Sequence, residues 1–257
     1  MGLFFGGEEE HFAPGVRKSG FPRYREVLES SYKEFFLVGF LTLIFYIPFA
    51  AGMVLAVLSS SLLVALAAGL LGGAIAGPGL ACMYDLILRR LRDDQFDWCY
   101  SWKRSMKQNW RASLLPGMEQ HLFLAVIVYA GALIHWGAAA LTPGVIVFLA
   151  AATVLVVMLM SAWWPQVVLF EQRSVIQQKN ALLFVLLHFG KALLAALLQI
   201  AWWAVMLLFL PWTAFVVPIL GVWYILFLAM HILYPDLDAE LRIEEQIEEQ
   251  FPGEMGT

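Results

Sequence analysis

The stretch GPGLACMYDLILRRLRDDQFDWCYSWKRSMKQNW, residues Gly77 to Trp110, passes within a few residues from a hydrophobic helix to a cationic segment. Its first part belongs to an apolar run over 61–88, which exceeds the ~20 residues that a helix needs to cross a bilayer. Its second part carries three tryptophans among lysines and arginines. This junction predicts a membrane-spanning helix followed by a helix that lies on the membrane surface.

The composition of the whole chain also indicates a membrane protein. Hydrophobic residues make up 61% of the 257 residues, charged residues make up 14%, and the mean hydropathy is +0.75. These values lie well outside the range of soluble domains. Six runs are apolar and long enough to span a bilayer, and they cover residues 35–58, 61–88, 114–136, 144–170, 181–209 and 212–234.

We therefore expect an all-α, polytopic membrane protein. The predicted fold is a bundle of six transmembrane helices with an interfacial amphipathic helix, at about 94–113, between helices 2 and 3. The expected parts of the chain are a cytoplasmic N-terminal segment over 1–34, the transmembrane domain over 35–234, and an acidic cytoplasmic tail over 235–257.

The distribution of charge predicts the orientation. All 16 lysines and arginines precede the first run, lie between the second and third, surround the start of the fifth, or follow the sixth. With six spans these places share one side of the membrane. The turns on the other side, 59–61, 137–143 and 210–212, contain no charged residue. The positive-inside rule predicts that both termini lie in the cytoplasm, in a bacterial cytoplasmic membrane.

Small residues recur at every fourth position of the second run. Such a stripe lets the backbone of another helix approach closely. It predicts a close helix crossing within the chain or an interface with a partner's helix, and it consists of Ala65, Gly69, Gly73, Gly77 and Ala81.

The cationic segment has the pattern of an interfacial helix. Its tryptophans lie four or eight residues apart, and Asp93, Asp94 and Asp97 before it offer N-caps. We expect the indoles at headgroup depth and the cations facing anionic lipid headgroups or an acidic partner, the protein's own tail included. The alternative is a membrane anchor without a partner. The residues are Trp98, Trp102, Lys103, Arg104, Lys107, Trp110 and Arg111.

Few ionisable residues lie within the predicted spans. Burying a charge in lipid costs several kcal/mol unless it is paired, so such residues are candidates for function. Asp85 precedes Arg89 by one helical turn, and Glu119 and Lys191 are predicted to pair at similar depth. We expect an ionic cluster of Asp85, Glu119 and Lys191, either as a structural ion pair or as a proton or ion relay.

The tail after Tyr234 carries eight acids and a single cation, Arg242. The spacing of Ile243, Ile247 and Phe251 predicts a short amphipathic helix. The alternative is a solvated tail without fixed structure.

Motifs for catalysis are missing from the sequence. It contains no glycine-rich phosphate loop, no nucleophile elbow, no paired His–Glu zinc motif and no clustered thiols. We expect no enzymatic activity, no cofactor, no metal site and no nucleic-acid binding.

Seven stretches occur in an order that resembles the YesL-like family of bacterial integral membrane proteins, whose function is unknown. They are MGLFFGG (1–7), APGV (13–16), YIPFAAG (46–52), GPGLACMYDLILRRLRDD (77–94), SWKRSMKQNWRASL (101–114), WWPQVVLFE (163–171) and QKNALLFVLLHFGKALL (178–194). Members are typically encoded beside carbohydrate importers and polysaccharide-degrading enzymes. The resemblance implies an accessory role in sugar uptake or its sensing, and it supplies no binding or catalytic residues.

Two functions from different classes are expected. One is a non-enzymatic accessory or regulatory subunit of a carbohydrate (ABC-type) uptake system, with the importer or another membrane protein as partner. The other is a small transporter or channel acting alone, for instance as a homo-oligomer. A permease subunit of the importer is disfavoured because the inner loop lacks the Ala- and Gly-containing coupling motif.

Overall fold

A computed structural model describes residues 17–94, 97–137 and 142–250, with the side chains of 248–250 left out. Residues 1–16 of the predicted N-terminal segment, residues 95–96 and Phe251 lie outside the described part. The regular elements are α1 (Gly20–Leu58), α2 (Leu62–Leu91), α3 (Trp98–Asn109), α4 (Leu114–His135), α5 (Pro143–Leu169), α6 (Ser174–Leu187), α7 (Phe189–Leu208), the 3₁₀-helix η1 (Trp212–Phe215), the π-helix η2 (Val217–Gly221), α8 (Trp223–Leu241) and α9 (Ile243–Gln250).

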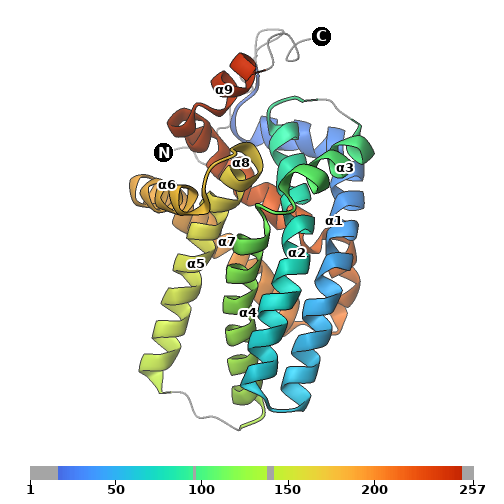
Figure 1. Cartoon of the computed structure of the whole chain (residues 1–257), viewed down its shortest axis with the longest axis vertical. Coiled ribbons are helices and arrows are strands. Elements are labelled where there is room, and N and C mark those ends of the chain that lie inside the picture. Colours follow the sequence, from blue (N-terminus) through green and yellow to red (C-terminus); the bar gives the residue numbers. More distant parts are fainter. Residues whose placement is uncertain (1–16, 95–96, 138–141, 251–257) are drawn as a thin grey trace.

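Six helices are long and apolar enough to cross a membrane. They are α1, α2, α4, α5, α7 and the segment Val217–Leu241, which joins η2 to α8. The helices α1, α2, α4 and α5 run along the long axis of the molecule, α8 is tilted against them, and the start of α1 lies at the same end of the bundle as α9 (Figure 1). The predicted all-α bundle of six transmembrane helices is confirmed, and the chain folds as a multi-pass membrane protein.

The two ends of the bundle differ in chemistry. We call the end that holds residues 17–34, 89–94, 97–111, 171–191 and 234–250 the charged end. The opposite end, which we call the apolar end, holds the turn at 59–61, the end of α4, the start of α5 and residues 209–216 (Figure 1). The described residues of these turns carry no Asp, Glu, Lys or Arg.

The first helix is longer than its apolar run. α1 begins at Gly20, so its polar first turns belong to one continuous helix of 39 residues. At 1.5 Å per residue this helix is about 58 Å long, which exceeds the ~30 Å of a hydrocarbon core. Ion pairs between residues one helical turn apart, such as Arg25 and Glu29 at 2.6 Å, stabilise this polar part of the helix.

The fifth predicted span, 181–209, is divided into two helices. α6 ends at Leu187, His188 has the non-helical angles φ −112° and ψ 37°, and α7 alone is long enough to cross. α6 lies across the charged end of α5 in Figure 1. Hydropathy does not detect this break because both sides of it are apolar.

The sixth predicted span, 212–234, begins irregularly and ends late. η1 and η2 precede α8, and α8 continues through Pro235 to Leu241, so three acids assigned to the tail lie inside it. Arg242 then takes left-handed angles, with φ 47°, and α9 follows. The predicted helix around Ile243 and Ile247 is confirmed, and the Ile243 side chain is fully buried.

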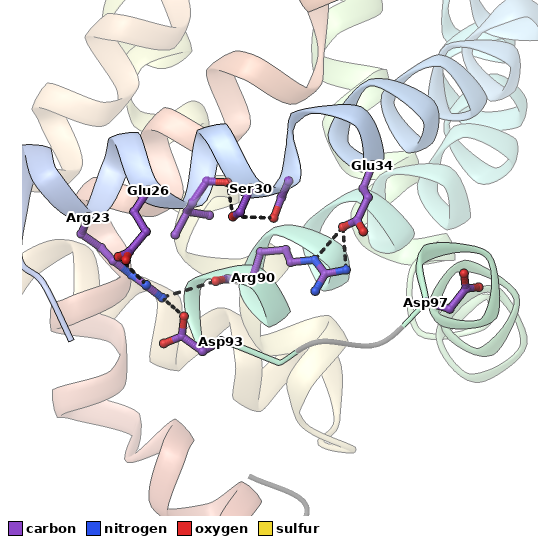
Figure 2. A pocket seen from close by; sticks show the side chains of 9 residues that line it. Arg23, Glu26, Ser30, Glu34, Arg90, Asp93 and Asp97 are labelled. Atoms are coloured by element: carbon purple, nitrogen blue, oxygen red, sulfur yellow. Dashed lines mark hydrogen bonds and ion pairs between the residues drawn. The ribbon is translucent and has the colours of Figure 1, made fainter. Parts of the chain in front are cut away.

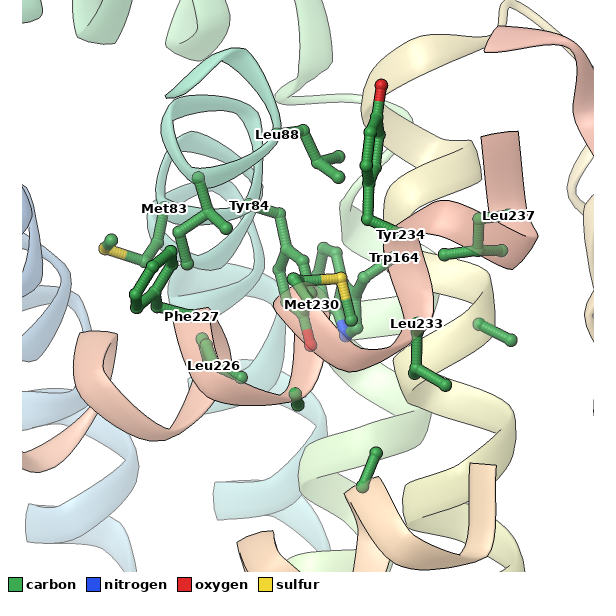
Figure 3. Packing of buried hydrophobic residues seen from close by; sticks show 14 of the residues in the cluster. Met83, Tyr84, Leu88, Trp164, Leu226, Phe227, Met230, Leu233, Tyr234 and Leu237 are labelled. Carbon is green, nitrogen blue, oxygen red and sulfur yellow. The ribbon is translucent and has the colours of Figure 1, made fainter. Parts of the chain in front are cut away.

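The main hydrophobic core joins α2, α5 and α8 near the charged end. Tyr84 of α2 stacks on Trp164 of α5 with ring centroids 5.6 Å apart, and Met230 and Leu233 of α8 lie against this cluster (Figure 3). Phe35 of α1 meets Phe227 at 5.1 Å. Burial of these large side chains stabilises the end of the bundle that carries the charges.

Candidate functional site at the charged end

The small-residue stripe of α2 packs on α4 of the same chain. A Cβ atom on Gly73 would lie 2.8 Å from the Cβ of His121 and would overlap the Gly117 carbonyl oxygen. A Cβ on Gly117 would in turn lie 2.5 Å from the Gly73 carbonyl oxygen. The close helix crossing is therefore intramolecular. Members of the stripe are all buried, and they are Ala65, Gly69, Gly73, Gly77 and Ala81.

A second small face of α2, which the sequence analysis missed, packs on α1. A Cβ on Gly72 would lie 2.6 Å from the Cα of Phe49, and one on Gly79 would lie 3.1 Å from Phe45. Gly52 of α1 approaches Ala68 in the same way. The signal that was available is the spacing of four residues from Ala68 to Gly72 and of seven from Gly72 to Gly79. With one small face on each side, α2 is the central helix between α1 and α4.

The predicted cluster of Asp85, Glu119 and Lys191 is wrong. Asp85 pairs with Arg89 at 3.2 Å, and Arg89 also binds Asp94 at 2.8 Å. The Glu119 carboxylate accepts from the amide of Gln178 on α6 at 3.1 Å. The Lys191 ammonium pairs with Asp236 of α8 at 2.7 Å. Because α6 is a separate helix beside α4 and α5, Lys191 enters with α7 and meets α8 instead of Glu119.

Arginines from the N-terminal part of the chain cap the C-terminus of α2. The last carbonyls of a helix have no partner within the helix. Arg23 donates to the Leu91 carbonyl at 3.0 Å and to the Asp93 carboxylate at 2.7 Å, and Arg17 donates to the Arg92 carbonyl at 3.2 Å. Arg90 pairs with Glu34 at 2.6 Å. These contacts join α1 to the end of α2 and neutralise most cations there.

A polar groove of about 570 Å³ separates the start of α1 from the end of α2. Arg23 and Asp93 lie at one side of the groove, Arg90 and Glu34 at the other, and Ser30 lies between them (Figure 2). Because both arginines are already paired with carboxylates, this groove offers a ligand no free cation. We regard it as part of the structural ion-pair network.

Arg92 differs from the other arginines at this end. Its side chain is 6% exposed, and its Nη1 atom has no hydrogen-bond partner among the described residues. Burial lowers the pKa of its guanidinium below the ordinary value. Asp85 and Asp94 are the acids whose charges act on it, so it belongs to the same network as Arg89.

The cationic helix α3 is held against α2 by its small residues. The Asp97 carboxylate caps the helix by accepting from the amide of Tyr100 at 2.9 Å, as predicted. Ser101 and Ser105 form its buried face, and Cys82 of α2 donates to the Trp102 carbonyl at 3.6 Å. The helix is shorter than the predicted 94–113.

The three tryptophans of this segment do not share one environment. Trp98 and Trp102 are half-buried and pack against the main core. Neither indole is therefore free to contact lipid in the way that the sequence predicts. Trp110 is 47% exposed and carries the Arg111 guanidinium over its ring at 5.7 Å. Four-residue spacing places Trp98 and Trp102 on one face, and that face turns toward the protein, whereas Trp110 follows the helix and is exposed.

The cations of α3 have no acidic partner among the residues that the structure describes. No described acid lies within ion-pair distance of them, whereas Arg23 and Arg25 of α1 and Arg89 and Arg90 of α2 each pair with one. The described acids of the tail bind elsewhere, since Glu244 pairs with Arg17 and Glu245 with Arg242. We define the cationic face of α3 as the side chains of Lys103, Arg104 and Lys107, with those of Trp110 and Arg111 directly after the helix.

Comparisons with other proteins add nothing to this site, because no protein-family model, curated protein or solved structure matches the chain. Within the described residues, no three His, Cys, Asp or Glu side chains group as metal ligands. What α3 offers is a surface whose lysines and arginines have no acidic partner among the described residues, beside a network of paired arginines from α1 and α2.

Proposed function

We propose that the protein is a non-enzymatic accessory or regulatory subunit in a bacterial cytoplasmic membrane, and that it binds an acidic surface of a partner protein through the cationic face of α3. The observation that carries the proposal is the contrast in pairing. Arg17, Arg23, Arg89 and Arg90 are bound by acids of the chain, whereas Lys103 and Lys107 project without one among the described residues.

A rigid cationic face suits recognition of a partner. Ser101 and Ser105 pack α3 on α2, so little backbone freedom is lost when a partner binds. Unpaired charges at a membrane surface accelerate and orient encounter with a complementary surface. Trp110 adds an exposed aromatic group of the type enriched at protein interfaces.

The nature of the partner is proposed from the resemblance to the YesL-like family. That resemblance supports a carbohydrate importer of the ABC type as the protein bound. We further propose that the charged end, with both termini, faces the cytoplasm, where the nucleotide-binding subunits of such importers work.

The interrupted sixth span is the observation that would favour a transporter. Transporters often bind solute at carbonyls freed by broken helices. Here the indole of Trp202 donates to the Gly221 carbonyl at 3.1 Å, and that of Trp223 donates to the Ile219 carbonyl at 2.7 Å. Since these carbonyls are occupied by the protein's own side chains, the interruption favours a structural role, and we place the transporter second.

Replacing Lys103, Arg104 and Lys107 together by glutamine should weaken the complex about tenfold or more. Exposed ion pairs contribute about 0.2–1 kcal/mol each, and 1.4 kcal/mol corresponds to a factor of ten. The measurement is the stoichiometry and dissociation constant of the complex purified from native membranes in mild detergent.

The matched control replaces Lys18, Arg25 and Arg242, three cations that already have acidic partners within the chain. It removes the same charge and should leave the complex intact. If the parent protein purifies as a homo-oligomer around a polar pore, the proposal is wrong and the transporter is favoured. If the α3 variant keeps the complex but loses bound anionic lipid, the cationic face is a lipid site.

A further inference from the structure

α6 is too short to be a membrane span and does not run with the spans. Its 14 residues make a helix of about 21 Å, against the ~30 Å of a hydrocarbon core. It lies across the charged end of α5 (Figure 1). Its position therefore corresponds to the boundary between membrane and water.

The inner face of α6 is anchored by a buried polar side chain. Gln177 is 2% exposed, and its amide donates to the carbonyls of Phe170 at 3.1 Å and Gln166 at 3.3 Å, at the end of α5. Its oxygen accepts from the indole of Trp163 at 3.2 Å. Both carbonyls also accept from backbone amides, those of Phe170 and Gln172, so the Gln177 amide adds a second donor to each and fixes how α6 is rotated.

The outer face of α6 is almost entirely aliphatic. Six of its side chains are between 46% and 68% exposed, and they recur with helical spacing on one side: Val175, Ile176, Leu182, Leu183, Leu186 and Leu187. In a helix on a soluble protein the apolar face is buried and the polar face exposed. α6 differs in being apolar on both faces, since Ala181, Phe184 and Val185 are buried beside Gln177 while the leucines lie outside. An exposed aliphatic surface of this size would be costly in water.

We propose that α6 lies in the plane of the membrane interface, with its outer face inserted among the acyl chains of anionic phospholipids. Two observations identify lipid as the occupant. Lys179 lies within the outer face and Arg173 precedes the helix, and neither has an acidic partner among the described residues. The face also continues into the apolar surface of the transmembrane helix α7, where Phe189 and Leu197 are 55% and 47% exposed.

Lipid chemistry fits both parts of this surface. Aliphatic side chains insert 5–10 Å into the acyl boundary, while cations extend to the headgroups. Each cation near an anionic bilayer contributes attraction that high salt weakens. This inference is independent of the partner proposed for α3, since it concerns another helix and another class of ligand.

The test places nitroxide labels at Leu183 and Leu187, in a variant with Cys82 and Cys99 replaced, in nanodiscs that contain phosphatidylglycerol. Label at Arg25 is the control for water, and label at Leu155 of α5 is the control for lipid. We expect both α6 labels to be more accessible to oxygen than to a water-soluble nickel chelate, as at Leu155. Accessibility like that of Arg25 would overturn the proposal. Shielding from both reagents would also overturn it, because a protein would then cover the face.

A second measurement tests the lipid headgroup. Replacing Arg173 and Lys179 by glutamine should lower the preference for phosphatidylglycerol over phosphatidylcholine about fivefold per charge. The same change at Arg25 and Lys18, which have acidic partners, should lower it much less. An unchanged preference in the Arg173 and Lys179 variant would overturn the assignment of anionic lipid.

Discussion

Replacement of Gly73 by leucine is expected to disrupt the bundle more than any other single substitution proposed. At this position α2 and α4 meet backbone to backbone, and a Cβ would overlap the carbonyl oxygen of Gly117. A backbone atom cannot rotate away as a side chain can. Overpacking usually costs about 1–3 kcal/mol and occasionally more, and we expect the free energy of unfolding to fall by an amount in the upper part of that range. The measurement is the free energy of unfolding of the purified protein in detergent.

Two control substitutions use the same helices. A Cβ on Gly131 of α4 would have no neighbouring atom within 4 Å, so Gly131→Leu adds the same atoms without a clash. Leu71 of α2 is 69% exposed, and Leu71→Phe enlarges a side chain that faces outward. Both should change stability by less than about 0.5 kcal/mol. Losses equal to that of Gly73→Leu would mean that the helix crossing is not as close as described.

The substitution Arg23→Gln is expected to have the second-largest effect. The Arg23 guanidinium is 9% exposed and binds Glu26, Asp93 and the Leu91 carbonyl. Without it, carbonyls at the end of α2 lose a donor, which costs about 1–3 kcal/mol for a buried group. Because the Asp93 side chain is 51% exposed, water can replace its contact with Arg23. We therefore expect the free energy of unfolding to fall by about 2 kcal/mol. The measurement is again the free energy of unfolding in detergent.

Arg25→Gln is the matched control for this substitution. Arg25 lies two residues away on the same helix and pairs with Glu29, but its side chain is 70% exposed. An exposed ion pair of this kind contributes about 0–1 kcal/mol. Unfolding of the two variants by the same denaturant should therefore give clearly different midpoints. If the midpoints coincide, Arg23 does not hold α1 to α2.

The membrane fold could be predicted from the sequence because a span requires a minimum apolar length. The run at 61–88 and the glycines within it predict α2 and its close neighbour without any long-range information. Hydropathy alone assigns a span wrongly where an apolar helix does not cross the membrane. The leucines of α6 read as the start of the fifth span, although Gln177 anchors that helix on α5 and His188 ends it.

The charged end was less predictable because its contacts join distant residues. Arg23 and Asp93 are 70 positions apart, and Lys191 and Asp236 are 45 apart. Many cations face many acids in this chain, so spacing alone cannot select the pairs. The cap at Asp97 was predicted because it depends on three neighbouring residues, whereas the inward turn of Trp98 depends on how α3 packs on α2.

Reaction of single cysteines with a membrane-impermeant maleimide in intact cells tests the central claim most directly, namely that the charged end faces the cytoplasm. Cysteines placed at Ser60 and Gly144, at the apolar end, should react from outside. Native Cys99 and a cysteine at Lys107 should react only after the cells are opened. Labelling of Lys107→Cys in sealed cells, with Ser60→Cys protected, would contradict the orientation and the cytoplasmic partner proposed for α3.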